Sequence, residues 1–271
     1  MKINWFPGHM KKALDEMRNE LSKADVIVYV LDSRAPKSCL NPELSRLTNG
    51  KPILYILNKI DLTDYDRLEK MQNDFKGEKI DCMLVNSTQS GLGSQVCSKI
   101  KHLCREKIKK FQDKGIGVTV RALVVGVPNC GKSTLVNNLC KKAKAVTGDR
   151  PGVTKGKQWF KIGNGVEICD TPGTLYPDLN DQEKARSLAF IGSIRDEILD
   201  EVEMANEFIQ RVEKLYPGTI AARYKNAGSL EEICRVRAFL LPEGELDISR
   251  AARAVIGDFR SGKLGKIMIE E

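Results

Sequence analysis

Short apolar runs alternate with amphipathic segments along the first two thirds of this 271-residue chain. Apolar runs rich in β-branched residues predict strands, and the segments between them repeat apolar residues at helical spacing. This alternation is typical of a mostly parallel sheet with helices on both faces, so we predict an α/β domain over residues 1–179. The expected strands are 26–31, 53–57, 83–85, 118–125, 155–162 and 166–169, and the expected helices are 40–47, 65–75, 96–111 and 132–139.

The pattern changes after residue 180, where apolar residues recur at helical spacing alone. Prolines and glycines near 217 and 242–244 divide this part into segments. Ser229 and Glu232 have the spacing of a capping box at a helix start. We predict a separate all-α domain over residues 180–271, with helices at 183–190, 194–215, 230–240 and 249–259.

A glycine-rich loop, Gly-Val-Pro-Asn-Cys-Gly-Lys-Ser at residues 126–133, lies between an expected strand and an expected helix. This is the context in which such a loop binds phosphate, because backbone N–H groups and the helix N-terminus favour an anion. Lys132 would reach the β- and γ-phosphates, and the Ser133 hydroxyl would ligate Mg²⁺. Taken alone, the loop indicates a nucleotide without saying which one. Its expected nucleotide contacts are Asn129, Cys130, Gly131, Lys132, Ser133 and Thr134.

The base is indicated by Asn58-Lys59-Ile60-Asp61, which follows an expected buried strand. The Asp61 carboxylate accepts from the ring N–H and the exocyclic amine of guanine, whereas adenine offers neither donor in that arrangement. The Lys59 stem can lie over the purine face, and Asn58 can brace neighbouring loops. A second base-contacting loop is expected at Asn86 and Ser87, after the strand at 83–85.

Asp170-Thr171-Pro172-Gly173 ends a further expected strand. Asp170 would hold Mg²⁺ through water, and the Gly173 N–H would contact the γ-phosphate. Thr154 is the expected switch I hydroxyl of the metal shell, with Thr147 as the alternative. We favour Thr154 because the run after it, 155–162, is expected to pair with the strand at 166–169.

These motifs occur in a rotated order, because an ordinary GTPase runs from the phosphate loop through DxxG to NKxD. Here NKxD comes first, which predicts a circularly permuted GTPase. As a consequence, the segment after Gly173 leads directly into the predicted helical domain. We therefore expect switch II to transmit the nucleotide state to that domain.

Net charge and cysteine content indicate the kind of partner and argue against a zinc protein. The net charge is +8, with 14 Lys and Arg against 17 Asp and Glu in residues 180–271, so the basic excess lies in the predicted GTPase domain. A basic domain suits a polyanion, and RNA is the expected one. Eight cysteines without a CxxC pair and two histidines argue against zinc. The sequence contains no signal peptide and no apolar run near eighteen residues, so we expect a soluble cytoplasmic protein without membrane association.

The motifs together with Trp5-Phe6-Pro7-Gly8-His9-Met10 and Asp32-Ser33-Arg34-Ala35-Pro36 resemble the ribosome biogenesis GTPase A (YlqF-like) family. The resemblance covers essentially the whole chain. It implies a circularly permuted GTPase that assists late assembly of the large (50S) ribosomal subunit. It also implies rRNA and ribosomal proteins as partners, a C-terminal helical RNA-binding domain and stimulation of GTP hydrolysis by the ribosomal particle.

Catalysis is where the sequence is least explicit. Many GTPases orient water with Gln directly after DxxG, but Thr174 stands at that place, and Thr also departs from the apolar residue of related permuted GTPases. In the family that the chain resembles, the histidine of the WFPGHM segment is the proposed water-positioning group, which corresponds to His9. Asn129 resembles the phosphate-loop residue of GTPases that bind K⁺ beside the phosphates. The alternative for Asn129 is a residue that a tight turn tolerates.

We therefore expect a monomeric, Mg²⁺-dependent and K⁺-activated GTPase that binds GTP and GDP and assists 50S assembly. Two other classes remain open. One is a GTP-dependent switch acting on tRNA, another non-ribosomal RNA or a membrane. The other is an RNA-binding protein whose nucleotide is structural and never hydrolysed. An ATPase is the weakest alternative, because Asp61 offers adenine only an acceptor.

Overall fold

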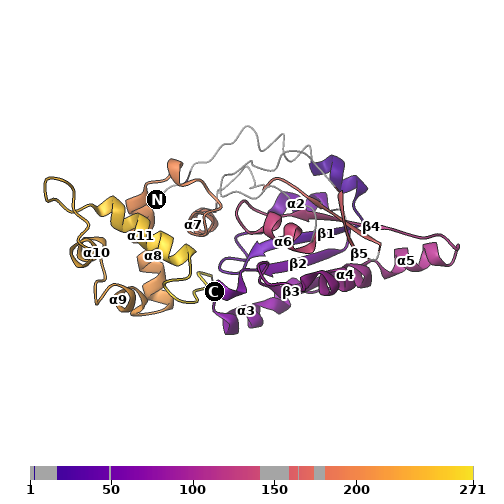
Figure 1. The fold of residues 1–271 in the computed structure, drawn as a ribbon, viewed down its shortest axis with the longest axis horizontal. Helices are drawn as coiled ribbons and strands as arrows, with labels where there is room; N and C mark the ends of the chain where they lie inside the picture. Colours follow the sequence, from indigo (N-terminus) through magenta and orange to yellow (C-terminus); the bar gives the residue numbers. More distant parts are fainter. Residues whose placement is uncertain are drawn as a thin grey trace.

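The structure is a computed structural model that describes residue 3 and residues 17–48, 50–140, 159–163, 165–173 and 181–270. A sheet with its surrounding helices forms one part of the elongated molecule, and a bundle of helices forms the other (Figure 1). The C-terminal end of the chain lies back beside the sheet. The two parts correspond to the α/β and all-α regions expected from the sequence.

Six strands form a single sheet in the order β3-β2-β1-β4-β6-β5. Neighbouring strands are parallel except β5 and β6, whose pairing was expected and which run antiparallel. The mostly parallel α/β prediction is therefore confirmed. The strand bounds are β1 Val26–Asp32, β2 Ile53–Asn58, β3 Ile80–Val85, β4 Val120–Val125, β5 Trp159–Gly163 and β6 Val166–Asp170.

Both faces of the sheet are covered. Tyr29 and Tyr55 are in register on adjacent strands, so they project from one face, and the Tyr55 ring meets Phe75 beyond helix α3 (Tyr65–Met71). Asp81 is one residue out of that register and projects from the other face, because side chains alternate along a strand. Its carboxylate binds Lys99 of helix α4 (Leu92–Leu103).

Several predicted helices have different ends in the structure. The predicted helix 194–215 is wrong at its start, because the Asp200 side chain caps the N–H groups of Val202 and Glu203 and the helix begins at Glu201. The predicted helix 230–240 ends at Arg237, since Ala238 adopts the left-handed conformation. The segment 96–111 breaks at Cys104, and the capping box of Ser229 and Glu232 is present.

The remaining α-helices are short to medium in length. The sequence did not predict the short helix α9 (Thr219–Arg223). A 3₁₀ turn at Gln72–Phe75 follows α3, and another at Asp196–Ile198 precedes α8. The bounds are α2 Pro42–Leu47, α5 Arg105–Gln112, α6 Lys132–Leu139, α7 Gln182–Phe190, α8 Glu201–Leu215, α9 Thr219–Arg223, α10 Leu230–Arg237 and α11 Ile248–Arg260. None of the described helices combines the length and apolar composition that a membrane crossing requires.

The helical region has an aromatic centre in which Phe208 of α8 contacts Phe190 of α7 and Phe259 of α11. The tail after α11 leaves this centre and packs onto the sheet domain. Ile269 N donates to Arg34 O, and the Glu270 carboxylate accepts from the backbone N–H groups of Lys37 and Ser38. The last described residues therefore hold the helical region against the sheet domain.

Candidate functional site

The motif residues come together because each follows the carboxyl end of a parallel strand. Residues 58–61 begin at the last residue of β2, residues 86–88 follow β3, residues 126–133 follow β4, and residues 170–173 begin at the last residue of β6. Ligands bind parallel α/β sheets at this edge. Among the expected site residues, the structure describes all but His9 and Thr154, and it places them around the phosphate loop.

The phosphate loop depends on two glycines. A Cβ on Gly126 (φ +150°) would lie 2.3 Å from Val30 O, and one on Gly131 (φ +98°) would lie 2.2 Å from the Asn58 amide nitrogen. Both residues also have positive φ, which side chains disfavour. The buried Lys132 folds over the loop and donates to Val127 O at 2.8 Å. The Lys132 ammonium is therefore bound by the backbone of the loop that precedes it.

Asn58 joins three loops, as the sequence suggested. Its amide nitrogen donates to Cys130 O at 2.8 Å, and its amide oxygen accepts from Ser87 N at 3.0 Å. Asn138 of α6 adds a second brace, donating to Ser87 O and Gln89 O. Asn86 accepts from the N–H and hydroxyl of Thr88, so it shapes the turn of the base loop. This network fixes the base loop relative to the phosphate loop.

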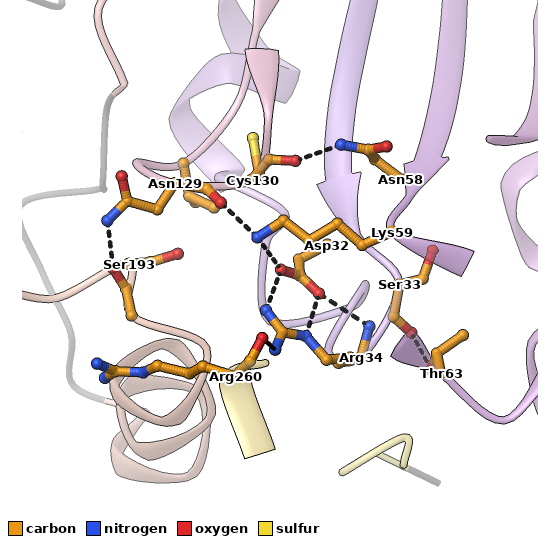
Figure 2. Close-up of polar contacts among 12 residues, drawn as sticks. Asp32, Ser33, Arg34, Asn58, Lys59, Thr63, Asn129, Cys130, Ser193 and Arg260 are labelled. Carbon is orange, nitrogen blue, oxygen red and sulfur yellow. Dashed lines mark hydrogen bonds and ion pairs between the residues drawn. The ribbon is translucent and has the colours of Figure 1, made fainter. Parts of the chain in front are cut away.

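Lys59 extends across the site toward the phosphate loop (Figure 2). Its ammonium donates to Asn129 O at 2.6 Å and lies 2.9 Å from Asp32 Oδ2. Asp61, the expected guanine acceptor, is exposed at the start of a 3₁₀ turn, Ile60–Leu62. The Lys59 stem and the Asp61 carboxylate are thus available to the face and the edge of a base.

Ser133 and Asp170, the two residues expected to hold Mg²⁺, lie next to each other. The Ser133 hydroxyl donates to Asp170 Oδ2 at 2.7 Å, and within the described residues the buried Asp170 Oδ1 has no hydrogen-bond partner. Burial raises the pKa of the Asp170 carboxyl above its ordinary value. A hydroxyl and a carboxylate with an unused oxygen suit Mg²⁺, which prefers oxygen ligands. The residues present therefore fit the metal.

Gly173 lies directly against the phosphate loop. A Cβ there would come within 2.7 Å of Pro128 Cα and 3.0 Å of the Lys132 ammonium nitrogen. The backbone of the DTPG segment can approach the loop this closely because the residue is glycine. The backbone at Gly173 therefore lies beside the Lys132 ammonium at the phosphate loop.

Asn129, the candidate K⁺ ligand, has φ +59° and is exposed at the tip of the loop. Its amide nitrogen donates to Gly192 O at 2.8 Å, and the Ser193 hydroxyl donates to Pro128 O at 2.8 Å. Both partners belong to the α7–α8 connection (residues 191–200). The loop thus touches the helical region, and the Asn129 amide oxygen is the atom that a K⁺ ion would require.

Cys130 is fully buried in the loop, and burial raises the pKa of its thiol. A buried neutral thiol is a poor nucleophile. The other seven cysteines are buried and free as well.

His9, Thr147, Thr154 and Thr174 lie outside the described residues. The described residue nearest His9 in sequence is Ile3, which is buried and exchanges hydrogen bonds with the Gln182 side chain at the start of α7. Ile3 therefore lies at the helix that follows the switch II segment.

Sequence reasoning missed four residues of the site: Asp32, Arg34, Asn138 and Ser193. Asp32 and Arg34 were noted only as part of the Asp-Ser-Arg-Ala-Pro turn, and a charged pair directly after a buried strand was the available signal. Nothing in the sequence indicated Ser193, because its contact with Pro128 spans 65 residues.

Comparisons with known proteins agree with this geometry. A sequence model of the family described as "50S ribosome-binding GTPase" matches residues 121–221. The chain is 39% identical to ribosome biogenesis GTPase A of Bacillus cereus, over 100% of this chain and 94% of the relative. It is 31% identical to the protein of that name from Thermotoga maritima, over 99% of this chain and 94% of the relative.

Two solved structures are similar over nearly their full length. GNP-bound YlqF from T. maritima aligns with a TM-score of 0.65 and 28% identity, covering 96% of this chain and 98% of that one. The GDP-bound structure of TM YlqF aligns with a TM-score of 0.66 and 25% identity, covering 94% and 98%. One of these similar structures is bound to GNP and the other to GDP.

Proposed function

Because this chain belongs to the ribosome biogenesis GTPase A family and is a GTPase, we propose that it is an assembly factor for the large ribosomal subunit. The ribosomal particle stimulates GTP hydrolysis, and the nucleotide state changes how the helical region sits on rRNA. The support is the full-length similarity to relatives named for ribosome biogenesis and the family described as 50S-binding. Assembly of ribosomes places this activity in the cytoplasm.

Guanine is selected by Asp61, with Lys59 on the purine face. The exposed Asp61 carboxylate and the Lys59 ammonium at 2.6 Å from Asn129 O support this assignment. Replacing Asp61 with Asn exchanges an acceptor for a donor. We expect Asp61→Asn to weaken GTP binding and strengthen binding of the xanthine nucleotide, which has a carbonyl in place of the exocyclic amine. Unchanged preference for guanine in that variant would contradict the assignment.

Mg²⁺ is held by Ser133 and Asp170, with Thr154 completing its shell, and it supplies charge neutralisation at the β- and γ-phosphates. The pairing of Ser133 with Asp170 and the unused Asp170 Oδ1 support this assignment. Lys132 holds the phosphate oxygens, and the Gly173 N–H contacts the γ-phosphate. Calorimetric titration with Mg²⁺ in the presence of GDP tests the metal pair, and tight Mg²⁺ binding retained in Asp170→Asn would contradict it.

Hydrolysis requires a positioned water, and His9 is the proposed group. A neutral imidazole accepts a proton from water near neutral pH. The docking of Ile3 on Gln182, at the start of the helix after switch II, supports a role for the N-terminal segment. Asn129 would supply an oxygen to K⁺ beside the phosphates, and the bound ion would add positive charge there.

Residues 180–271 form the proposed RNA-contacting domain. The aromatic centre of Phe190, Phe208 and Phe259 gives this part a core of its own. The contacts of Gly192 and Ser193 with the phosphate loop offer a direct route for the nucleotide state to reach it. This route adds to the expected connection through switch II.

The testing experiment measures GTP hydrolysis in K⁺ buffer with and without purified large subunits, for the natural chain and His9→Ala. Strong stimulation that disappears in His9→Ala while GTP binding persists supports both the ribosomal function and the histidine. Stimulation that survives the substitution retains the ribosomal function and excludes His9. Absence of stimulation by mature and immature particles rejects the assembly function in favour of a different RNA target.

A further inference from the structure

Asp32 is completely buried at the carboxyl end of β1, the strand between β2 and β4 in the sheet. Its Oδ1 accepts from the backbone N–H of Arg34 at 3.1 Å and from Arg34 Nε at 2.9 Å. Its Oδ2 accepts from Arg34 Nη2 at 2.7 Å and lies 2.9 Å from the Lys59 ammonium. One buried carboxylate therefore binds two cations, and one of them is the lysine of the base-reading motif.

We propose that Asp32 is a positioning residue for guanine-nucleotide binding, which holds the Lys59 side chain in the extended conformation that a purine stacks on. This inference rests on the purine-stacking role proposed for Lys59. Figure 2 shows Lys59 stretched between Asp32 and Asn129 O, so that two acceptors fix its ammonium and leave the stem lying across the site.

The physical reason is the flexibility of lysine. A lysine side chain has many rotamers, and a free lysine would lose this freedom when a base stacks on it. The carboxylate restricts Lys59 before the nucleotide arrives, so binding orders less of the protein. The complete burial of Asp32 also strengthens its attraction for the Lys59 ammonium compared with an exposed pair.

Arg34 keeps this carboxylate charged and immobile. Burial by itself raises the pKa of Asp32, but the Arg34 guanidinium and the Lys59 ammonium outweigh burial and hold that pKa well below its ordinary value. A bidentate arginine also fixes the plane of the carboxylate. Asp32 can therefore serve Lys59 as an acceptor of fixed position.

Arg34 also connects this arrangement to the helical region. Its guanidinium lies 4.9 Å from the centre of the Phe259 ring of α11, and its Nη1 donates to Arg260 O at 3.2 Å. The Arg260 side chain in turn donates to Ala189 O and Phe190 O and pairs with Asp196. The pose of α11 and the position of Lys59 are thus joined through the Asp32–Arg34 pair.

The test measures the dissociation constant of fluorescent GDP for the full chain and for Asp32→Asn, Lys59→Met and the double variant. Asn keeps Oδ1 for Arg34 Nε but replaces Oδ2 with an amide nitrogen, which can accept from neither Lys59 nor Arg34 Nη2. Lys59→Met keeps an apolar stem and leaves the Asp32–Arg34 pair intact. Asp25→Asn is the matched control, because Asp25 pairs with Lys107 at the opposite end of β1.

We expect Asp32→Asn and Lys59→Met each to weaken GDP binding about tenfold, the effect of losing one hydrogen bond to a charged group. We expect the double variant to bind no worse than Lys59→Met, because Asp32 acts through Lys59. Asp25→Asn should bind GDP normally. The ratio of the dissociation constants for GDP and for inosine diphosphate (IDP) should stay unchanged in Asp32→Asn. The base of IDP lacks the exocyclic amine that Asp61 contacts, so this ratio reports on the edge of the base, whereas Lys59 contacts its face.

The outcomes separate the possible failures. Normal GDP binding by Lys59→Met rejects the proposed role of Lys59 and the inference with it. Weakened binding by Lys59→Met with normal binding by Asp32→Asn rejects the inference alone. An equal further loss when Asp32→Asn is added to Lys59→Met shows that Asp32 supports the fold generally, and this also overturns the inference.

If Asp32→Asn does not fold, the inference is tested instead by measuring how far GDP protects the backbone amides of α11 from hydrogen exchange. GDP should protect α11 in the natural chain and protect it less in Lys59→Met, and equal protection overturns the inference.

Discussion

The Asn129 side-chain amide donates a hydrogen bond to Gly192 O, 2.8 Å away, across 63 residues of sequence. Asn129 stands at the tip of the phosphate loop, whereas Gly192 belongs to the connection that follows α7. The rotated order of the motifs led us to expect that the helical region is reached through switch II. The structure shows that the helical region also contacts the phosphate loop itself.

The first prediction concerns potassium. If Asn129 Oδ1 is a K⁺ ligand, Asn129→Ala should lower hydrolysis in K⁺ by about tenfold or more and remove the difference between K⁺ and Na⁺ buffers. The substitution also removes the hydrogen bond to Gly192. Ser193→Ala is therefore the control, since it removes the parallel bond to Pro128 O and leaves Asn129 in place. Steady-state phosphate release in both buffers is the measurement. Loss of the K⁺ difference in Ser193→Ala as well would assign the effect to the loosened contact.

A second prediction follows from the approach of Gly173 to the phosphate loop. A Cβ at this position would lie 2.7 Å from Pro128 Cα, so Gly173→Ala must displace the DTPG segment or the loop. We expect GTP binding to weaken about tenfold to a hundredfold by loss of the γ-phosphate contact, with a smaller effect on GDP. Equilibrium titration with both nucleotides measures the difference. Gly93→Ala in α4, where a Cβ has open space, should bind both nucleotides normally. Equal weakening of GTP and GDP in Gly173→Ala would contradict the γ-phosphate role.

A third prediction concerns acid stability. Asp32 has a folded-state pKa that Arg34 and Lys59 hold below its ordinary value, despite the opposing effect of burial. A group with a lowered pKa stabilises the folded state above its unfolded pKa of about 4, and this contribution is lost as the pH falls further. The natural chain should therefore lose stability below pH 4 more steeply than Asp32→Asn. Urea denaturation followed by circular dichroism between pH 5 and 2.5 compares them, and parallel curves would be inconsistent with a charged Asp32.

A fourth prediction concerns the core of the helical region. Phe208 is completely buried, and its ring centroid lies 5.3 Å from that of Phe190 and 4.7 Å from that of Phe259. Phe208→Ala should cost about 3–5 kcal/mol of unfolding free energy, because the cavity adds to the lost burial. Ile198→Ala, at a side chain that is 48% exposed, should change stability little. Urea denaturation of both variants measures the free energies. Similar values for the two would show that the aromatic cluster is not the stabilising core.

The strands and the motif loops of this protein could be predicted from local sequence. The β-branched runs define the strands, because fully buried parallel strands require continuous apolar residues. The glycine-rich loop between β4 and α6 and the meeting of Ser133 with Asp170 could be predicted because strand ends in a parallel sheet converge on one edge, whatever the order of the strands along the chain. The limits of α8 and α10 were wrong, since the Asp200 cap and the left-handed Ala238 outweighed the helical spacing of apolar residues around them.

Other features were decided only by tertiary structure. Apolar spacing and strand ends carry no information on which distant loops meet, so the contact of Ser193 with Pro128 could not be foreseen. The same holds for Asp32, whose burial beside both Arg34 and Lys59 depends on β1 lying between β2 and β4. The sequence by itself determined which residues stand at the strand ends and predicted which of them would bind the nucleotide, because that chemistry is local to each motif. The tertiary structure decided how those groups are joined to the helical region, because long-range packing selects the partners of each side chain.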